Sequence, residues 1–363
     1  MRRIGRGIGL ALAAAASLVA EPARPSQPPQ PSRPARIVAV GDLHGDYEAW
    51  REIALRARLV DARNRWAGGS TVFVQAGDIT DRGPDSLKII RHLMKLRKEA
   101  ARAGGKVVVL VGNHEAMNMT GDLRYVHPGE FAAFANANSG RLRELTYVAN
   151  QAAITAAYRA RSPDMTERAI RDSWLAQNPL GKLEHQLAWG PRGELGRWTI
   201  ANPAVARIGE TIFVHGGISL RYAGVPFDEI NRRTAAALAS RTSAADSIIN
   251  DEFGPLWYRG LAGGTGATGD AERQVAATGE RAAAAPSADE ELSAALRSTG
   301  ARRMVVAHTP DRSGIKISHG GRLVRIDTGI SLHYGGKLSY LEIVGGKLVP
   351  HSWDRSPAPP RRR

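Results

Sequence analysis

Five short runs of β-branched and other apolar residues each lead to a side chain that is a common metal ligand. They occupy residues 38–45, 73–83, 109–115, 212–217 and 304–308. Buried strands of an α/β sheet read as continuous apolar runs. Functional sites in such folds lie at the carboxyl ends of the strands. The pattern therefore predicts one site that is assembled from five strand ends.

The first three runs alternate with segments that we interpret as helices, at residues 46–59 and 84–103. The second has apolar residues at helical spacing, with Pro84 in a typical first-turn position and a pair of glycines after residue 103 to stop it. A strand-helix-strand-helix-strand order is typical of a parallel sheet with right-handed crossovers.

Residues 115–200 have a different character, because they are rich in Ala and Arg and mostly helical in pattern. We interpret them as an insertion that forms a helical cap or wall beside the site. Strand patterns return at 198–206 and 211–215. Residues 260–286, rich in Gly, Ala and Thr, predict a mobile loop. A helix near 288–298 follows, and then strands at 304–308, 323–326 and 338–348.

Composition supports a folded, exported protein. Hydrophobic residues make up 43% of the 363-residue chain, which excludes a disordered chain and allows one large domain or two ordinary ones. The absence of cysteine excludes disulfides, thiolate catalysis and a lipid-modified cysteine. The formal net charge of +15 favours anionic partners. Basic and aromatic residues are not interleaved as in nucleic-acid platforms, so we expect a solvated Arg-rich surface and no nucleic-acid partner.

The amino-terminal residues resemble an export signal. Arg2, Arg3 and Arg6 precede an Ala-rich apolar stretch at 8–20 that is too short to span a bilayer comfortably. The alternative is an uncleaved membrane anchor; no other stretch is long and apolar enough for a span. We therefore expect a periplasmic or extracellular bacterial protein. The predicted organisation is an export signal at 1–20, a Pro-rich linker at 21–36, a folded domain at 37–350 with its insertion at 115–200, and a basic tail at 351–363.

The strand ends supply a mixed set of carboxylate, amide and imidazole ligands. The six candidates are Asp42, His44, Asp78, Asn113, His215 and His308. This chemistry suits Mn, Fe or Zn better than Ca, which prefers oxygen alone. Each histidine taken singly is more often a packed core residue, and only the five strand ends together favour a metal. Six ligands with one shared Asp indicate two ions about 3.5–4 Å apart, an arrangement that activates water and binds phosphoryl oxygens.

The same motifs, in their order and spacing, resemble those of calcineurin-like metallophosphoesterases, specifically the phosphoprotein phosphatase branch. The resemblance rests on GDLHG at 41–45, GDITDRG at 77–83, GNHE at 112–115, HGG at 215–217 and the later His308. Three further stretches are similar to the bacterial Shewanella-like phosphatases, namely NHEAMNM at 113–119, GDLRYV at 121–126 and GPLWYRG at 254–260. The resemblance implies an αββα fold, in which two β-sheets pack face to face with helices outside.

The resemblance also implies a role for each matching residue. Asp42, His44 and Asp78 would hold one divalent or trivalent ion, and Asp78, Asn113, His215 and His308 the other, with Mn effective in vitro and Fe or Zn as alternatives. His114 would protonate the leaving oxygen, and Asp81 would orient it. Arg82, Arg259 and Asn113 would contact phosphate oxygens. The alternative for Asp81 and Arg82 is an ion pair that closes the turn, and for Arg259 a surface arginine beside an aromatic residue.

The implied reaction is hydrolysis of a phosphomonoester on a protein or peptide, by in-line attack of metal-bridging hydroxide without a phosphoenzyme. The residues do not separate phosphotyrosine from phosphoserine and phosphothreonine, although the resemblance leans towards phosphotyrosine. The carboxy-terminal motif of the eukaryotic Ser/Thr enzymes is absent, and 326–331 stands in its place, so no regulatory subunit is implied. One rival is a nucleotide hydrolase acting on dinucleoside polyphosphates or cyclic diesters. The other is a catalytically silent, metal-bound module that binds phosphoproteins.

Two smaller groups of residues have no fixed role in the sequence. Asp122, Arg124 and Tyr125 follow the third motif and would either gate the cleft or form an ordinary loop ion pair. We interpret five histidines outside the motifs as surface or structural residues, namely His127, His185, His319, His333 and His351.

Overall fold

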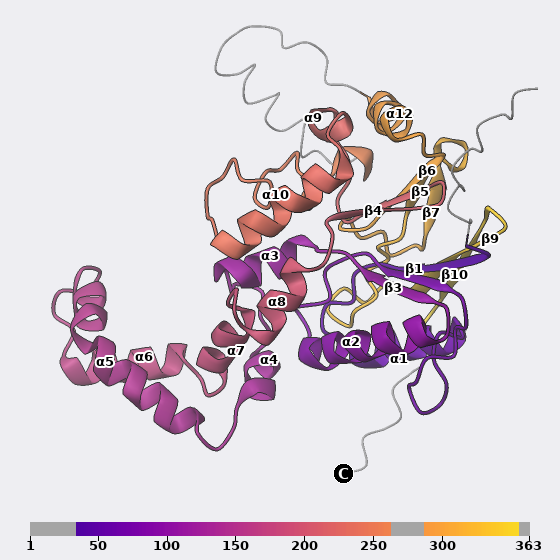
Figure 1. The fold of residues 1–363 in the computed structure, drawn as a ribbon. Coiled ribbons are helices and arrows are strands. Elements are labelled where there is room, and N and C mark those ends of the chain that lie inside the picture. Colours follow the sequence, from indigo (N-terminus) through magenta and orange to yellow (C-terminus); the bar gives the residue numbers. More distant parts are fainter. Residues whose placement is uncertain (1–33, 263–286, 356–363) are drawn as a thin grey trace, which may run out of the picture. The chain divides into compact units, whose positions relative to one another are not determined.

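Two five-stranded mixed β-sheets face each other, and helices cover their outer faces (Figure 1). This computed structural model describes residues 34–262 and 287–355. The first sheet has the order β10-β9-β1-β2-β3 and the second the order β4-β5-β6-β8-β7. The αββα arrangement predicted from the sequence is confirmed. The predictions for the export signal, most of the linker, most of the mobile loop and the last eight residues lie outside the described residues.

The strands of the first sheet are β1 (Arg36–Val40), β2 (Val72–Gln75), β3 (Lys106–Val109), β9 (Leu338–Val344) and β10 (Lys347–Trp353). Those of the second sheet are β4 (Val205–Ile208), β5 (Thr211–Val214), β6 (Arg303–Val306), β7 (Lys316–Ser318) and β8 (Leu323–Arg325). Strands β1, β2 and β3 are parallel, as are β5, β6 and β8. Each set of parallel strands therefore ends at one edge of its sheet.

Alternation along the strands divides the apolar residues between two layers. In β1, Ile37 and Ala39 pack with Phe213 and Val305 in the cluster between the two sheets. Val38 and Val40 point the other way and join the larger cluster under the helices. Successive side chains of a strand point to opposite faces, so an apolar strand is buried on both sides, and each such side chain contributes about 1.5–3 kcal/mol.

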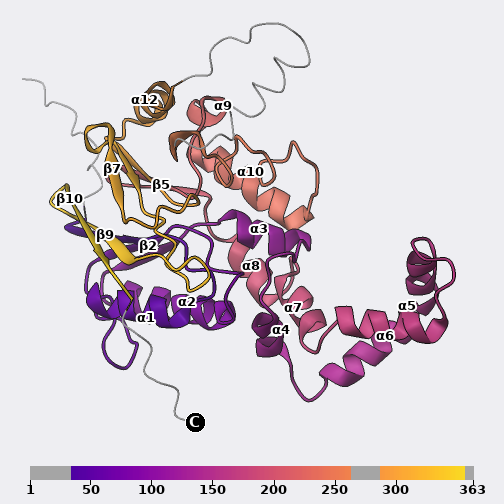
Figure 2. The same ribbon diagram turned by 180° about the vertical axis from the view of Figure 1, so that it is seen from behind.

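The helices α1 (Tyr47–Arg56) and α2 (Ser86–Arg102) cover the outer face of the first sheet (Figure 2). Both lie within the predicted helical segments. Asp46 caps α1 by accepting a hydrogen bond from the amide of Ala49. On the inner side of α1, Trp50 is fully buried and stacks on Phe73 of β2 at a ring distance of 5.2 Å. The packing of these two helices on the sheet thus fixes the positions of the loops after β1 and β2.

A run of helices follows β3, where the sequence predicted a helical insertion. They are α3 (Asn113–Thr120), α4 (Pro128–Phe134), α5 (Ser139–Arg159), α6 (Glu167–Gln177), α7 (Lys182–Trp189) and α8 (Glu194–Ile200). The predicted strand at 198–206 is wrong in its first half, because α8 continues to Ile200. Leu195 and Thr199 on α8 are both buried, and their four-residue spacing is that of a helix face. The strand begins only at Val205, after Pro203.

The second half of the chain contains elements that the sequence pattern did not indicate. These are the helices α9 (Leu220–Ala223) and α10 (Phe227–Ser240), the 3-10 turns η1 (Gly260–Ala262) and η2 (His319–Gly321), and strand β7. The predicted helix near 288–298 is present as α12 (Ala288–Thr299). None of the helices in the part of the chain that the structure describes has the length and hydropathy needed to cross a bilayer.

The predicted strand at 338–348 is a hairpin instead. Gly345 and Gly346 have φ angles of 54° and 84°, which turn the chain between β9 and β10. Strand β10 then runs to Trp353, so the first residues of the predicted basic tail belong to the sheet. His351 stacks on Tyr340 with ring centroids 4.3 Å apart, and the indole of Trp353 donates to Glu52 over 2.7 Å. These cross-strand contacts extend the domain beyond residue 350.

A buried carboxyl group joins the helical run to α2. Glu130 on α4 is 1% exposed, and it accepts a hydrogen bond from the hydroxyl of Ser86 at the start of α2. Burial raises the pKa of Glu130 from 4.5 to about 8. A raised pKa in the folded state stabilises the protein below the unfolded-state pKa, and this contribution is lost as the pH rises through the folded-state pKa.

We therefore expect Glu130→Gln to flatten the pH dependence of stability between about pH 4.5 and pH 8. Denaturant unfolding at pH 5, 7 and 9 should show that the free energy of unfolding of the variant rises relative to that of the wild type as the pH increases, because Gln never becomes charged. Glu167→Gln is at an exposed position on α6. Its free energy of unfolding should differ from that of the wild type by the same amount at all three pH values. A constant difference between Glu130→Gln and wild type at all three pH values would contradict the argument.

Candidate active site

The loops after β1 and β2 are joined by their backbones. The amides of Leu43 and His44 donate to the carbonyl of Asp78 over 2.9 and 3.0 Å, and the amide of Gly45 donates to that of Ile79 over 2.7 Å. Gly45 has a φ of 66°, and a Cβ atom there would lie 2.4 Å from the carbonyl oxygen of Gly83. Only glycine allows this approach, so the two motif loops meet where both contain glycine.

A buried carboxylate, Glu115, fixes the β2 loop against the start of α3. Its two oxygens accept four backbone hydrogen bonds of 2.8–3.2 Å, from the amides of Asp78, Ile79, Thr80 and Gly112. The side chain is 1% exposed. The sequence placed Glu115 in a motif but gave it no role. Its position shows that it holds the loop that presents Asp78, since a buried amide without an acceptor is costly.

Two of the predicted metal ligands have their ring nitrogens assigned by the backbone. His44 Nδ1 lies 3.0 Å from the carbonyl oxygen of Thr80, and His215 Nδ1 lies 2.9 Å from that of Ala76. A carbonyl accepts only, so each Nδ1 carries a proton and each Nε2 is the nitrogen available to a metal ion. This is the second-shell hydrogen bond typical of metal-binding histidines.

Those two Nε2 atoms face oxygen atoms that also have lone pairs. His44 Nε2 is 3.9 Å from carboxylate oxygens of both Asp42 and Asp78. His215 Nε2 is 3.2 Å from Asp78 Oδ2 and 3.0 Å from the side-chain oxygen of Asn113. Lone pairs repel one another at such distances unless a cation or a proton lies between them. The donor set therefore fits a bound metal ion.

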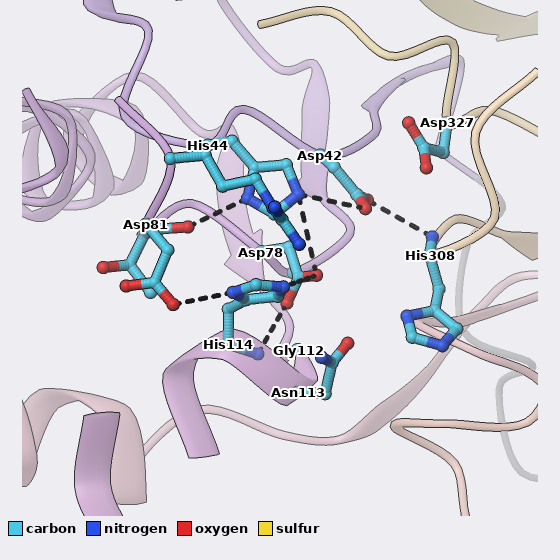
Figure 3. A network of polar contacts seen from close by, with 12 residues as sticks. Asp42, His44, Asp78, Asp81, Gly112, Asn113, His114, His308 and Asp327 are labelled. Carbon is cyan, nitrogen blue, oxygen red and sulfur yellow. Dashed lines mark hydrogen bonds and ion pairs between the residues drawn. The ribbon is translucent and has the colours of Figure 1, made fainter. Parts of the chain in front are cut away.

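His308 and Asp327 extend this set. His308 Nε2 is buried and makes no hydrogen bond within the described residues, while its backbone amide donates to Asp42 over 3.3 Å. Asp327 is 3% exposed and lies beside Asp42 (Figure 3). Asp327 was not among the ligands predicted from the sequence. It follows β8 as the other candidates follow their strands, so the same strand-end pattern could have found it.

The electrostatics of these residues favour a cation. Burial raises the pKa of Asp42, and the neighbouring Asp327 and Asp78 raise it further. Burial likewise raises the pKa of Asp327, to about 6. Burial lowers the pKa of His44 to about 3 and that of His308 well below its usual value, which keeps both imidazoles neutral. Neutral imidazoles beside crowded carboxylates are the state in which these groups bind metals.

Asp78 is common to both groups of residues whose ligand atoms lie close enough to share an ion. One group consists of Asp78, His44 and His114, and the other of Asp78, His215 and His308, with all ligand atoms of a group within 4.8 Å of one another. The structure thus brings together all six predicted metal ligands around Asp78. His114, for which we predicted a catalytic role, also faces Asp78, with its Nε2 3.9 Å from Oδ2.

The two residues predicted to act in catalysis form a close pair. His114 Nδ1 lies 2.6 Å from Asp81 Oδ2, and Asn118 donates to the other oxygen of Asp81 over 2.9 Å (Figure 3). Asp81 is fully buried. Burial alone would lower the pKa of His114, but the carboxylates of Asp78 and Asp81 raise it above its ordinary value. The imidazole is thus aimed by one carboxylate and favoured in its charged form.

The predicted phosphate-binding arginines lie on different sides of the site. The guanidinium of Arg82 lies over the ring of Tyr125 at 4.3 Å, and its Nη1 is 3.2 Å from His333 Nε2. Arg259 Nη1 donates to the carbonyl of His308 and the hydroxyl of Thr309, both over 3.1 Å. Arg82 therefore makes no ion pair with Asp81 among the described residues, contrary to the alternative for that turn. His333 is exposed, as we expected of a surface residue, and it lies beside Arg82.

The three residues of the loop after α3 differ in what they contact. Asp122 and Arg124 form an exposed ion pair of 2.6 Å, so they are an ordinary loop pair. Tyr125 instead lies against the site, with its ring 5.2 Å from that of His114. A cavity of about 860 Å³ opens beside Arg82, and its lining also includes His44 and His333.

Left-handed backbone conformations are concentrated here. His44, Asp78, Asp81, Arg82 and His308 have φ angles between 42° and 71°. Such conformations cost about 1–3 kcal/mol each for residues other than glycine and cluster at functional sites. The backbone therefore bears a conformational cost at these residues, and this directs their side chains into one site.

The comparison with known proteins identifies the class to which this fold and site belong. Residues 35–341 match the model of the calcineurin-like phosphoesterases, and the chain belongs to that family. Within the family it is of the Shewanella-like phosphatase type, as the motifs had suggested. It is 32% identical over 306 residues to Shewanella-like protein phosphatase 2 of Arabidopsis thaliana, covering 82% of this chain and 71% of that one.

Two other similarities differ in how much of the chain they cover. The crystal structure of a cold-active protein-tyrosine phosphatase from a psychrophilic Shewanella species superposes with a TM-score of 0.60 at 22% identity, covering 88% of this chain and 80% of that one. The symmetrical bis(5'-nucleosyl)-tetraphosphatase of Buchnera aphidicola is 32% identical over 80 residues, which are 22% of this chain and 24% of the other. The first likeness extends through the fold, whereas the second is confined to a short segment.

We expect Asp78→Asn to lose bound metal, because the amide removes the charge that both groups of ligands share. Metal content of the purified variant, measured by plasma mass spectrometry after incubation with Mn and desalting, should fall more than about tenfold. Asp61→Asn is a matched control, since Asp61 lies in an exposed turn and pairs with Arg65. A wild-type metal content in Asp78→Asn, with an unchanged circular dichroism spectrum, would overturn the assignment.

Proposed function

We propose that this chain is a metal-dependent phosphomonoesterase that acts on phosphorylated proteins. The observation that carries the proposal is the His114–Asp81 pair, 2.6 Å apart, which faces the shared ligand Asp78. A paired imidazole beside a metal site is suited to donating a proton to a departing oxygen. The chain has no cysteine, so a thiolate phosphoenzyme is not available to it.

The ligand set supports two ions. Asp42, His44 and Asp78 would hold one, and Asp78, Asn113, His215 and His308 the other, with Mn the expected ion in vitro and Fe or Zn as alternatives. When bound, the ions would supply a hydroxide nucleophile at neutral pH and positive charge for the phosphoryl oxygens. Asp327 lies beside Asp42 and adds negative charge to the first position.

The remaining residues would bind the substrate and manage its proton. Arg82, Arg259 and Asn113 would contact the phosphoryl oxygens, for which a planar guanidinium is well suited. His114 would give its proton to the leaving oxygen as the phosphorus–oxygen bond breaks. Asp81 would keep that imidazole charged and oriented, and Asn118 would hold Asp81 in place.

Several observations favour a protein substrate over the two rivals. The relative from Arabidopsis is named a protein phosphatase and is similar over most of this chain. The likeness to nucleotide hydrolases covers about a fifth of it. The cavity of about 860 Å³ beside Arg82 offers room for residues that flank a phosphorylated side chain. A silent binding module would have no use for a buried, oriented imidazole.

We expect the chelated enzyme to be inactive and Mn to restore hydrolysis of phosphopeptides. A steady-state panel of phosphotyrosine and phosphothreonine peptides, bis-aryl phosphate and a dinucleoside tetraphosphate separates the candidate functions. The phosphopeptides should have the highest kcat/KM. A dominant rate on the diester or the polyphosphate would favour the nucleotide hydrolase.

The matched variant for this panel is His114→Asn, which removes the proton donor but leaves the six proposed ligands in place. We expect kcat to fall about 10²–10⁴-fold, while Mn content stays at the wild-type level. Wild-type turnover in this variant would refute the role of His114. A wild-type protein that binds phosphopeptide but turns over none of the panel would establish the silent module.

Export is part of the proposal and rests on the basic and apolar pattern of residues 1–20. Expressed in a Gram-negative host as the full chain, the protein should appear in the periplasmic fraction, shortened at its amino terminus. Deletion of residues 2–20 should leave it in the cytoplasm. Recovery of the uncut full chain in the membrane fraction would favour the anchor instead.

A further inference from the structure

A second cavity, of about 620 Å³, opens at the end of the second sheet that lies opposite the candidate active site. It is lined by the last turn of α12, which packs beside β6 (Figure 1), and by the residues at the start of β6 and before β8. Strands β6 and β8 are parallel, and their carboxyl ends lead to His308 and Asp327. Because the cavity lies at the amino ends of the same two strands, it is separate from the candidate active site.

Arginines dominate the lining of this cavity. Arg297, Arg302, Arg303 and Arg322 all belong to it, and its described lining includes no aspartate or glutamate. We call it the arginine cavity. Four guanidinium groups around one space repel one another, and an anion placed among them would relieve that repulsion. The described lining also contains no aromatic residue, so the cavity lacks the stacking surface that nucleobases use.

The fold holds two of these arginines on neighbouring strands. Arg303 is the first residue of β6 and is 7% exposed. Arg322 comes directly before β8, and its carbonyl accepts the amide of Met304 over 2.8 Å. Its guanidinium also donates to the hydroxyl of Ser293 on α12 over 2.9 Å. Side chains whose positions are already restricted lose little freedom when a ligand binds.

The carboxylates that pair with two of the arginines lie outside the lining. Asp289 pairs with Arg322 and also with His319, whose Nδ1 is 3.0 Å away. Glu210 lies 3.5 Å from Arg302, whose side chain is exposed. Exposed ion pairs contribute little, and Asp289 serves two basic groups at once. These carboxylates therefore compensate only part of the positive charge around the arginine cavity.

Arg297 is not needed to close the helix on which it lies. An arginine in the last turn of a helix can offset the helix dipole and contact the terminal carbonyls. At α12, however, Arg207 of β4 donates to the carbonyls of Thr299 and Gly300. Arg297 is exposed, and it forms no ion pair with another residue that the structure describes. Its guanidinium is therefore available to a ligand in the arginine cavity.

We propose that the arginine cavity binds a small anion that carries two or more adjacent phosphoryl groups. A guanidinium has a planar pair of donors that matches the oxygens of a phosphoryl group. Four guanidiniums offer more donors than one orthophosphate can accept, and the volume falls within the usual range of small-ligand sites, about 300–1,000 Å³. Soluble polyphosphates and the headgroups of diphosphoryl lipids share this chemistry. The inference does not depend on the proposed hydrolase activity.

Calorimetric titration of the full chain, without added metal, with inorganic tripolyphosphate tests the site. We expect tripolyphosphate to bind, and orthophosphate to bind at least about tenfold more weakly because it reaches fewer guanidiniums. The double variant Arg297→Gln, Arg302→Gln should raise the Kd for tripolyphosphate at least about tenfold. Both positions are exposed, so the variant should fold as the wild type does, and a thermal melt checks this.

Two control variants separate the arginine cavity from other sources of binding. Arg168→Gln combined with Arg232→Gln removes the same charge from two exposed arginines that do not line the cavity. This change should alter the Kd by less than about twofold. Arg82→Ala removes a proposed phosphate ligand of the metal site, and it should leave the binding of tripolyphosphate intact.

Hydrogen exchange locates the bound anion on the chain. Tripolyphosphate should slow amide exchange in residues 296–303 and 319–323, which contain the lining of the arginine cavity. It should leave exchange in the motif loop at 41–45 unchanged. Protection of that loop alone would place the anion at the metal site and contradict the inference.

Sedimentation with phosphatidylcholine vesicles that contain cardiolipin, a lipid with a diphosphoryl headgroup, identifies the source of the ligand. Vesicle binding that Arg297→Gln, Arg302→Gln weakens would support a lipid headgroup, and its absence would support a soluble polyphosphate. The inference would be overturned if the wild type bound no tripolyphosphate, if both double variants weakened binding equally, or if Arg82→Ala abolished it.

Discussion

The carboxylate of Asp78 is buried among three imidazoles, and the backbone around it is bonded in three directions. Its carbonyl accepts the amides of Leu43 and His44, its amide donates to Glu115, and its Oδ1 accepts the amide of His114. The loops after β1, β2 and β3 are thus tied together at one residue. Displacing Asp78 would therefore disturb both groups of candidate ligands and the proposed proton donor at once.

Buried carboxylates lie close together around this residue. Asp42, Asp78 and Asp327 are all buried within one polar cluster. Such a group of carboxylates is unfavourable in a low-dielectric interior unless a cation is present. His44 Nε2 lies 3.9 Å from carboxylate oxygens of Asp42 and Asp78, and a ring nitrogen of His308 lies within 4.8 Å of ligand atoms of Asp78 and His215. The chain belongs to the metallophosphoesterase family, in which a bound metal ion would supply this cation.

Around this centre the protein adds groups that differ in how firmly they are held. Glu115 and Asn118 are buried and satisfied, and they fix Asp78 and Asp81. Arg82 lies against the rings of Tyr125 and Tyr334 and near His333, and among the described residues no carboxylate pairs with it. In the proposed function its guanidinium would therefore be available to a phosphate. The side chains at the mouth of the site are therefore held less firmly than those at its floor.

The sequence alone determined the strands that carry the site and the ligands at their ends, because apolar runs and polar strand ends are local features. It also indicated α1, α2 and α12, whose caps and spacing are local. It missed the β9–β10 hairpin, the helix at Trp198, Asp327 and the contacts of Glu115. Asp327 follows β8 as the predicted ligands follow their strands, so the strand-end pattern could have found it. The contacts of Glu115 and the pairing of β10 with β9 depend on which segments lie side by side in the fold, and no local pattern records that. Only the tertiary structure decided that Tyr125 and Tyr334, 209 positions apart in the numbering, both lie against Arg82, since the α3–α4 loop and the β8–β9 loop meet there.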